Sequence, residues 1–511
     1  MMIGIVCAAI VSAGLAELNT EDLKAEVRPG NGTTQPFWNV CSKQFLYAPS
    51  FDFDAIPGAV KYDFCLTDAK GNTHRFKAER PTASLASVWM SVAPGPAKLV
   101  VTANGTNVVG RREFHRAAPF APESYPPAAR AYGECADRAL GWMYGCAWVR
   151  HWAEGTPDKS YQLNCFPSKM VPAAINSMLT YAELHPEKRA EALKIAENAA
   201  TWLMENSVRE PESMKGLPIT YFDYFEETKA LGDPWDSKLI AHRKRDQVMM
   251  IYPALVAKAY LRLAKATAKR AYFDYAKNIA ERYLALQRKD GSWSFMLQFP
   301  SGDVISGNAA GETDICEFLD EMSAETGDAR YRAAADRAIP AMEQRLGTFD
   351  WEGQFEDMEP QRKPYANLSK HIAADTMIYL LGRDPKKYRA AARETLRFAE
   401  DQFVAWSSPA QASWYVPGVI EQFDCAVTID ASYAKMIRFY LKLYEVEGNP
   451  LDLAKAQALG DAVTRNQMPD GLIPTVFPYD PKRQGRNWLN CMYAAIRALR
   501  ELEAGCQRRS P

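Results

Sequence analysis

A stripe of four residues between positions 242 and 252 has the spacing and the side-chain types of a reactive site. His242, Arg245, Met249 and Tyr252 follow one another at intervals of three, four and three residues. On a helix these intervals place all four side chains on one face. An imidazole, a guanidinium and a phenol on one face could remove a proton beside a carboxylate, because the cation stabilises the charge that develops. The structural alternative is an amphipathic helix with a solvated basic start and a core tyrosine.

Two of the six histidines, His242 and His371, open predicted helices that begin on the same side of the fold. A single histidine is more often structural than catalytic, so two at one predicted opening strengthen the prediction of a site. Neighbouring openings carry amide, guanidinium and phenol groups that a purely structural helix does not need. These residues are Asn176, Arg243, Asn367 and Tyr433.

Acidic residues on the same side support a competing prediction. Two carboxylates at a suitable separation form the acid and base of a glycoside hydrolase. The same residues could instead offset helix dipoles or keep loops solvated. The candidates are Glu312, Asp314, Glu356, Asp357, Asp424 and Asp430. Aromatic side chains of the long loops could stack on sugar rings, although many will fill gaps between loops and helices.

The elements that must position these residues are helical hairpins. Five pairs of predicted helices are joined by short polar turns, and a long aromatic stretch follows each pair. This repetition places the short turns on one face and the elaborate loops, where sites usually lie, on the other. The turns are at 185–188, 267–270, 326–330, 382–385 and 447–450. The helices are expected near 131–152, 168–184, 187–205, 242–265, 269–288, 311–325, 328–345, 367–382, 385–405, 430–446, 450–467 and 487–503.

Pairing of the first and last of these helices would make a sixth hairpin and close a ring. The sequence therefore predicts a mainly α fold, an (α/α)6 toroid over residues 131–503. A ring of seven hairpins is an alternative. An open solenoid is the alternative, but it would need polar capping repeats. The last helix, 487–503, is too apolar to be an outer cap.

The first part of the chain follows different patterns. Residues 1–16 form an apolar run that ends in Gly14-Leu15-Ala16, which predicts a signal peptide cleaved before Glu17. Residues 35–118 contain alternating runs and hairpin turns at 68–72 and 103–106, which predict a small β-sandwich of fibronectin or immunoglobulin type. The ten cysteines show no CxxC spacing, so no zinc site is expected. Cys41 and Cys65 could pair in an oxidising compartment.

Composition limits the partners of the protein. The chain has 511 residues, of which 47% are hydrophobic and 24% charged, and a formal net charge of −1. A net charge this small gives no general attraction to nucleic acid or to an anionic membrane. No segment after the predicted signal is apolar enough to span a bilayer. An anionic substrate must therefore be held by local cations. Separately, we expect the protein to be a monomer or a dimer.

Four stretches resemble secreted carbohydrate-active enzymes of the α/α-toroid type. They are LQRKDGSW at 286–293, WEGQFED at 351–357, YANLSKH at 365–371 and EQFDC at 421–425. With the small β-domain in front, the chain resembles the uronate-cleaving polysaccharide lyases, in particular polysaccharide lyase family 38. The resemblance implies a secreted or periplasmic enzyme that cuts alginate, glucuronan or another uronan by β-elimination, with no metal or cofactor.

The resemblance also implies roles for particular residues. Amide, guanidinium or imidazole groups would neutralise the uronate carboxylate, and a tyrosine or histidine would move the protons. On this chain Tyr252 would be base and acid, with His242 or His371 as its partner. The neutralising residues would be Arg245, Asn176 and Asn367. The substrate-binding residues would be Arg243, Trp293, Trp351, Tyr365, Trp414 and Tyr433.

Three other functions remain open from the sequence. A glycoside hydrolase on the same toroid would use two of the carboxylates. A uronyl C5-epimerase would share the first proton abstraction with a lyase. A non-catalytic glycan-binding protein is the third alternative, although binding alone does not need a phenol beside a histidine.

Overall fold

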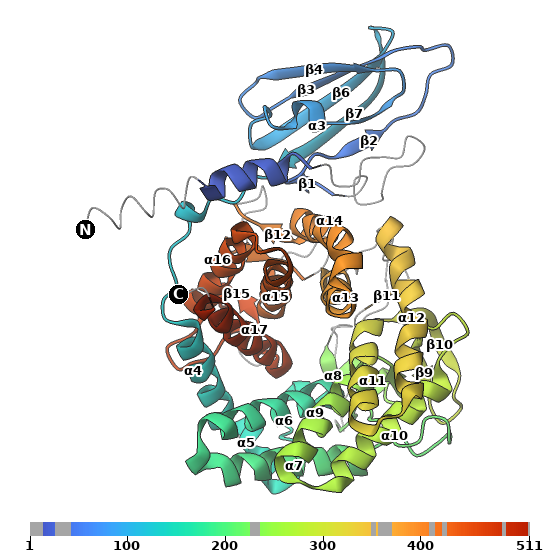
Figure 1. Cartoon of the computed structure of the whole chain (residues 1–511), viewed down its shortest axis with the longest axis vertical. Coiled ribbons are helices and arrows are strands. Elements are labelled where there is room, and N and C mark those ends of the chain that lie inside the picture. Colours follow the sequence, from blue (N-terminus) through green and yellow to red (C-terminus); the bar gives the residue numbers. More distant parts are fainter. Residues whose placement is uncertain are drawn as a thin grey trace, which may run out of the picture.

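Six helices that begin on one face of the molecule form an inner ring, and six others surround them (Figure 1). The computed structural model describes residues 14–25, 42–224, 236–348, 354–355, 370–407, 414–421, 427–482 and 487–508, with the backbone alone for 345–348, 354–355 and 370–373. The inner helices are α6 (Pro167–Leu184), α9 (Tyr252–Thr267), α11 (Glu312–Thr326), α13 (Lys370–Arg383), α15 (Asp430–Glu447) and α17 (Leu489–Gln507). The outer helices are α4 (Tyr132–Gly145), α7 (Arg189–Glu205), α10 (Arg270–Leu286), α12 (Ala329–Thr348), α14 (Pro385–Phe403) and α16 (Pro450–Asn466).

The two ends of the helical region close the ring. The last helix, α17, packs against α15 on one side and α6 on the other, and it pairs with α4 as the sixth hairpin. Figure 1 shows α4 beside α17 where the ring closes. This confirms the predicted (α/α)6 toroid. Within the described part of the chain the ring contains six hairpins.

The short turns between hairpin partners form for local reasons. Asp384 and Asn449 cap α14 and α16 by accepting hydrogen bonds from the backbone of Lys387 and Leu451. The proline that follows each cap has a fixed φ that suits the first helical position. Gly327 and Gly448 end α11 and α15 with φ of +73° and +70°, a conformation that glycine adopts at little cost.

The predicted helix 242–265 is wrong in its first third. Residues 237–243 form the short helix α8 (Ser237–Arg243), and β8 (Gln247–Met249) then pairs with β9 (Ser294–Gln298). Only at Tyr252 does α9 begin, with Pro253 in its first turn. The first turn of a helix does not need the backbone donor that proline lacks, so Pro253 suits the start of α9. The four-residue stripe therefore does not lie on one helix.

The long connections on the other face contain small sheets that the sequence analysis did not predict. The sheet order β11-β10-β9-β8 joins β10 (Val304–Ala310) and β11 (Gln354–Phe355) to β9 and β8. Two further ribbons pair β12 (Val404–Ala405) with β13 (Gly418–Val419), and β14 (Thr428–Ile429) with β15 (Val476–Phe477). Shorter elements are α5 (Ala147–Arg150) and 3₁₀ turns at Pro122–Ser124, His151–Glu154, Gln162–Cys165 and Pro186–Lys188.

The β-region near the N-terminus is a five-stranded sheet in the order β1-β7-β6-β3-β4, with a second ribbon, β2-β5. Its hairpins turn at 68–72 and 104–106, as the sequence indicates. The buried core of this region includes Phe64, Leu99 and Trp89. The elements are β1 (Gln44–Phe45), β2 (Ser50–Asp52), β3 (Tyr62–Thr67), β4 (Thr73–Ala78), β5 (Thr82–Ser84), α3 (Ala86–Trp89), β6 (Gly95–Ala103) and β7 (Asn107–Arg116).

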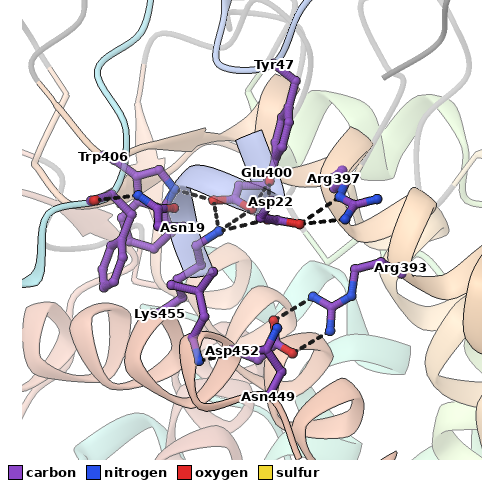
Figure 2. A network of polar contacts seen from close by, with 12 residues as sticks. Asn19, Asp22, Tyr47, Arg393, Arg397, Glu400, Trp406, Asn449, Asp452 and Lys455 are labelled. Carbon is purple, nitrogen blue, oxygen red and sulfur yellow. Dashed lines mark hydrogen bonds and ion pairs between the residues drawn. The ribbon is translucent and has the colours of Figure 1, made fainter. Parts of the chain in front are cut away.

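A buried charged cluster joins this β-region, the N-terminal helix 14–23 and the outer ring (Figure 2). Asp22 accepts hydrogen bonds from Tyr47 at 2.8 Å and from Arg397 at 2.8 Å. The Lys455 ammonium lies 2.7 Å from Glu400 and 3.6 Å from Asp22. Burial alone would lower the pKa of Lys455, but the two carboxylates outweigh it and raise that pKa. The predicted cleavage point before Glu17 falls inside the helix that carries Asp22.

Asp401, beside this cluster, makes stability depend on pH. Its Oδ1 accepts hydrogen bonds from the backbone N–H groups of Leu46 at 2.7 Å and Tyr47 at 2.8 Å. Burial raises the pKa of Asp401 from 3.8 to about 7. The folded state therefore binds a proton that the unfolded chain has lost, and stability falls as pH rises from about 4 to about 7.

We expect Asp401→Asn to remove this dependence. The amide oxygen keeps both backbone hydrogen bonds, and Gln402, whose Oε1 is buried without a partner in the described structure, can flip its amide to accept from the new Asn. The variant should be more stable than the wild type at pH 8, by up to about 4 kcal/mol, and equal to it near pH 4. Urea unfolding at both pH values measures this, and the same pH slope in both proteins would contradict the assignment.

Candidate active site in the lumen of the ring

The inner helices enclose a cavity of about 1220 Å³ that runs along the axis of the ring. All six inner helices contribute to its wall, together with residues of α8 and of the long loops. On α6 the lining extends from Lys169 to Glu183. These residues lie fourteen positions apart, about 21 Å at a rise of about 1.5 Å per residue. The cavity thus spans most of the height of the ring, and its wall divides into three levels.

The first level is the mouth on the long-loop face. Lys169 in the first turn of α6 directs its ammonium at three rings, with centroid distances of 4.7 Å to Trp488, 5.2 Å to Tyr252 and 5.7 Å to Phe166. Tyr252 is the first residue of α9 and is only 5% exposed. The helix starts bring these groups together because α6, α9 and α17 all begin on this face. The mouth therefore combines a cation, a phenol and apolar rings.

Further cations line the same end of the cavity. Arg243 ends α8, and Lys244 follows it with its ammonium 6.0 Å from the Tyr221 ring. Glu421 is the acidic lining residue on this face, so within the described structure the mouth has three cations and one carboxylate. Arg243 is exposed and has no ion-pair partner among the described residues. A mouth of this charge favours an anionic ligand.

The second level is a waist of lysine–carboxylate pairs. Lys258 of α9 lies 2.5 Å from Asp314 and 3.0 Å from Glu317 of α11, and Lys435 of α15 pairs with Asp375 of α13. Burial opposes ionisation of Asp314, but Lys258 and Lys435 outweigh it and hold the pKa of Asp314 below its ordinary value. Burial and the charge of Asp314 raise the pKa of Asp375, although Lys435 opposes them.

The third level lies deeper and is organised by Arg262. Its guanidinium donates to Asn176 at 2.7 Å, to Tyr493 at 2.9 Å and to Thr180 at 3.3 Å. Arg262 is ten residues after Tyr252 on α9, about 15 Å further along the axis. Asn176 is therefore separated in depth from the Tyr252 phenol.

Comparison with known proteins gives a likeness in fold. No protein-family model matches the sequence, and no curated protein matches it. The chain is similar to a family 76 glycoside hydrolase from a bovine Bacteroides thetaiotaomicron strain, at 9% identity and a TM-score of 0.44, over 90% of this chain and 98% of the other. It is similar to a cellobiose 2-epimerase from Spirochaeta thermophila, at 12% identity and a TM-score of 0.49, over 75% and 99%. A polysaccharide lyase is similar at 9% identity and a TM-score of 0.39, over 86% and 59%. At such identities these matches assign no role to any residue.

Three of the predicted site residues line the cavity: Tyr252, Arg243 and Asn176. His242 and Arg245 do not. The imidazole of His242 is 2.7 Å from Asp223, and the exposed Arg245 donates to the carbonyl of His242. They are separated from Tyr252 because β8 intervenes. The structure describes no side chain for four other predicted site residues, which are Asn367, His371, Trp351 and Tyr365.

Two of the predicted substrate-binding aromatic residues, Trp293 and Tyr433, are buried in the core, so these predictions are wrong. Trp293 is fully buried and donates from its indole to the carbonyl of Tyr283 at 2.9 Å. Tyr433 is also fully buried, and its hydroxyl donates to Pro417 at 2.8 Å. Both rings pack the core and cannot meet a ligand from these positions. Trp414 is half-buried against the core and does not line the cavity.

The carboxylate candidates divide in a similar way. Of the carboxylate candidates that the structure describes, only Asp314 lines the cavity. Glu312 is fully buried, and so is Asp430, whose pKa burial raises well above its ordinary value. The remaining three, Glu356, Asp357 and Asp424, lie outside the described residues. Within the described ranges no group of three or more His, Cys, Asp or Glu side chains could hold a metal ion.

Sequence reasoning missed Lys169, Lys258, Asp375 and Lys435. A usable signal was present for two of them, because each interrupts an apolar face. Lys258 follows Val256 and Ala257, both fully buried. Lys435 stands between Ala434 and Met436, which are also buried. A lysine in such a run must find a buried partner or line a polar cavity.

Proposed function

We propose that the chain is a glycan-processing enzyme that cleaves a uronic acid polymer by β-elimination at the mouth of the lumen. The observation that carries this proposal is the Lys169 ammonium beside the Tyr252 ring, in a mouth with two further cations. The phenol supplies a group that can transfer a proton, and the ammonium beside it can stabilise negative charge that develops in the reaction. The same cations suit a substrate whose reactive carbon is next to a carboxylate.

The reaction would proceed by one proton abstraction and one bond cleavage. Lys169 and Arg243 neutralise the uronate carboxylate, so that negative charge can build up on it as the C5 proton leaves. The Tyr252 phenolate takes that proton. The electron pair forms the C4–C5 double bond, the C4–O4 bond breaks, and the Tyr252 phenol returns a proton to the departing O4. The Trp488 and Phe166 rings offer apolar faces for the sugar.

The residues that neutralise the uronate carboxylate differ from those expected from the sequence. We assign carboxylate neutralisation to Lys169 and Arg243 rather than to Arg245 and Asn176, because Arg245 is outside the lumen and Asn176 is held by Arg262. Asn367 and His371 keep the roles proposed from the family 38 resemblance. Secretion and a monomeric or dimeric state also stay proposals. None of the described helices is long and apolar enough to cross a membrane.

Carboxyl reduction of the substrate tests the need for the uronate group. Polymannuronate, glucuronan and polygalacturonate would be supplied in native form and with their carboxyls reduced to alcohols. We expect cleavage of at least one native polymer and none of its reduced form, because elimination requires the acidity that the carboxylate gives to C5. Equal cleavage of both forms would contradict the proposal.

Glycoside hydrolysis is the second candidate, and the waist favours it. Asp314 and Asp375 line the cavity from neighbouring inner helices, and their environments shift their pKa values in opposite directions. Such a divergence is the pattern of a base and an acid in hydrolases. The candidate is second because Lys258 and Lys435 already engage these carboxylates.

An Asp375→Asn variant separates the two candidates. If the protein is a lyase, we expect its kcat to stay within a few-fold of wild type, because the amide can still accept from Lys435. If Asp375 is a general acid, kcat should fall by about 10²–10⁴-fold. Thermal unfolding of the variant shows whether any loss comes from misfolding, and a large loss in a stable variant would favour the hydrolase.

A further inference from the structure

The lumen reaches the short-turn face as well as the long-loop face. Glu183, which lines the cavity, is the last but one residue of α6, directly before the turn to α7. On α17 the lining continues to Arg500 and Glu501, about two turns beyond Tyr493. A cavity closed at the short-turn end would not include the ends of its wall helices.

Side-chain exposure also indicates a second opening. At the waist, Lys258, Asp375 and Lys435 are 24%, 19% and 21% exposed, and Glu317 is 40% exposed. Deeper in the lumen the exposure rises again, to 50% for Arg497 and 61% for Glu183. In a blind pocket exposure falls steadily with depth. The rise beyond the waist therefore means that solvent also enters from the short-turn face.

The deep end carries more guanidinium groups than carboxylates. Arg438 and Arg497 share one partner, Glu501, at 2.8 Å and 3.7 Å. Arg500 lies 3.4 Å from Asp137 on the outer helix α4. The arginines that line this end are Arg262, Arg438, Arg497 and Arg500, and the acidic residues are Glu183, Glu321 and Glu501. Arg262 lies 3.6 Å from Glu183. Guanidinium groups suit carboxylates, which they can bind in a bidentate way.

We infer that the short-turn end of the lumen is a second binding site, and that its ligand is a short uronate oligosaccharide. The ligand class rests on the proposed function, because a lyase at the mouth would release such fragments. The lysine–carboxylate waist separates the two sites, so the deep site can hold a fragment while the mouth is empty. Among the arginines of this site, Arg497 and Arg500 are the most exposed, at 50% and 39%.

Calorimetric titration with a uronate trisaccharide tests the inference. The titration uses the Tyr252→Phe background so that the probe is not consumed. We expect two binding events. The double variant Arg497→Ala/Arg500→Ala should weaken one of them by about tenfold or more, and Arg243→Ala should weaken the other. Lys194→Ala, an exposed residue of the outer helix α7, is the matched control and should change neither.

The outcomes separate this site from the proposed reaction. One binding event that responds only to Arg243→Ala would overturn the second site, and so would the absence of all binding. Two events in a protein that never produces a double bond would support the second site while removing the lyase. A circular dichroism spectrum of the double variant checks that its fold is intact.

Discussion

Tyr252→Phe should lower kcat on a uronic acid polymer by about 10²–10⁴-fold while the protein stays folded. The phenol lies at the mouth of the lumen, 5% exposed, with the Lys169 ammonium 5.2 Å from its ring. The substitution removes one oxygen and keeps the ring, so packing against Lys169 and the neighbouring side chains is preserved. Initial rates at saturating substrate measure the effect, because the lost step is proton transfer and not binding.

Tyr260→Phe is the matched control for this prediction. Tyr260 lies two turns further along α9, and its hydroxyl donates to the carbonyl of Ala200 at 2.5 Å in the core. Loss of that hydrogen bond should cost about 1 kcal/mol of stability and leave kcat unchanged. If Tyr252→Phe retained wild-type kcat, or if both variants lost activity equally, Tyr252 would have no part in the chemistry.

Lys455→Met should destabilise the protein by about 3–5 kcal/mol. The lysine is 2% exposed and lies between Glu400 and Asp22 (Figure 2). Methionine fills a similar volume, so the main loss is electrostatic: Glu400 would stay buried without its cation. Trp406 would still donate to Glu400, but it cannot neutralise it.

Urea denaturation compares this variant with Lys215→Met. Lys215 forms an ion pair with Glu212 at 3.2 Å in which both side chains are largely exposed, so its loss should cost less than about 1 kcal/mol. The cluster joins the N-terminal helix and the β-region to α14 and α16, and we therefore expect Lys455→Met to lower the stability of these four parts together. A change as small as that of the control would mean that the cluster contributes little.

The sequence predicted the architecture well because the architecture depends on local signals. Caps such as Asp384 and Asn449, and the left-handed Gly448, mark helix ends in this chain. The closure of the ring was also predictable, since the apolar last helix needed a partner. These features depend on neighbours within a few residues, or on the requirement that an apolar face be buried.

The site was predicted less well because it depends on contacts between distant residues. The stripe from His242 to Tyr252 had helical spacing, but pairing of Val248 and Met249 with β9 and the position of Pro253 ended that helix. Trp293 follows a turn at Gly291, and only the fold shows that its ring is covered. Which lysines face the lumen follows from the ring itself, since each inner helix has one face toward the lumen and one toward its outer partner.

Loop length indicated one end of the ring and not the other. Long loops identified the face that carries Tyr252 and Lys169, but the lining of the lumen also extends toward the short-turn face. Glu183 and Arg500 line the lumen near the short-turn face. Loop length reports where insertions are tolerated, whereas the openness of a ring depends on the size of the side chains at its inner wall.

Absorbance of the C4–C5 double bond is the measurement that tests the central claim most directly. The protein would be incubated with polymannuronate, glucuronan and polygalacturonate, and the ultraviolet absorbance of the unsaturated uronate followed together with the appearance of new reducing ends. A uronate lyase predicts that absorbance and reducing ends rise together on at least one polymer, and that Tyr252→Phe suppresses both. New reducing ends without the absorbance would contradict β-elimination and assign the lumen to hydrolysis.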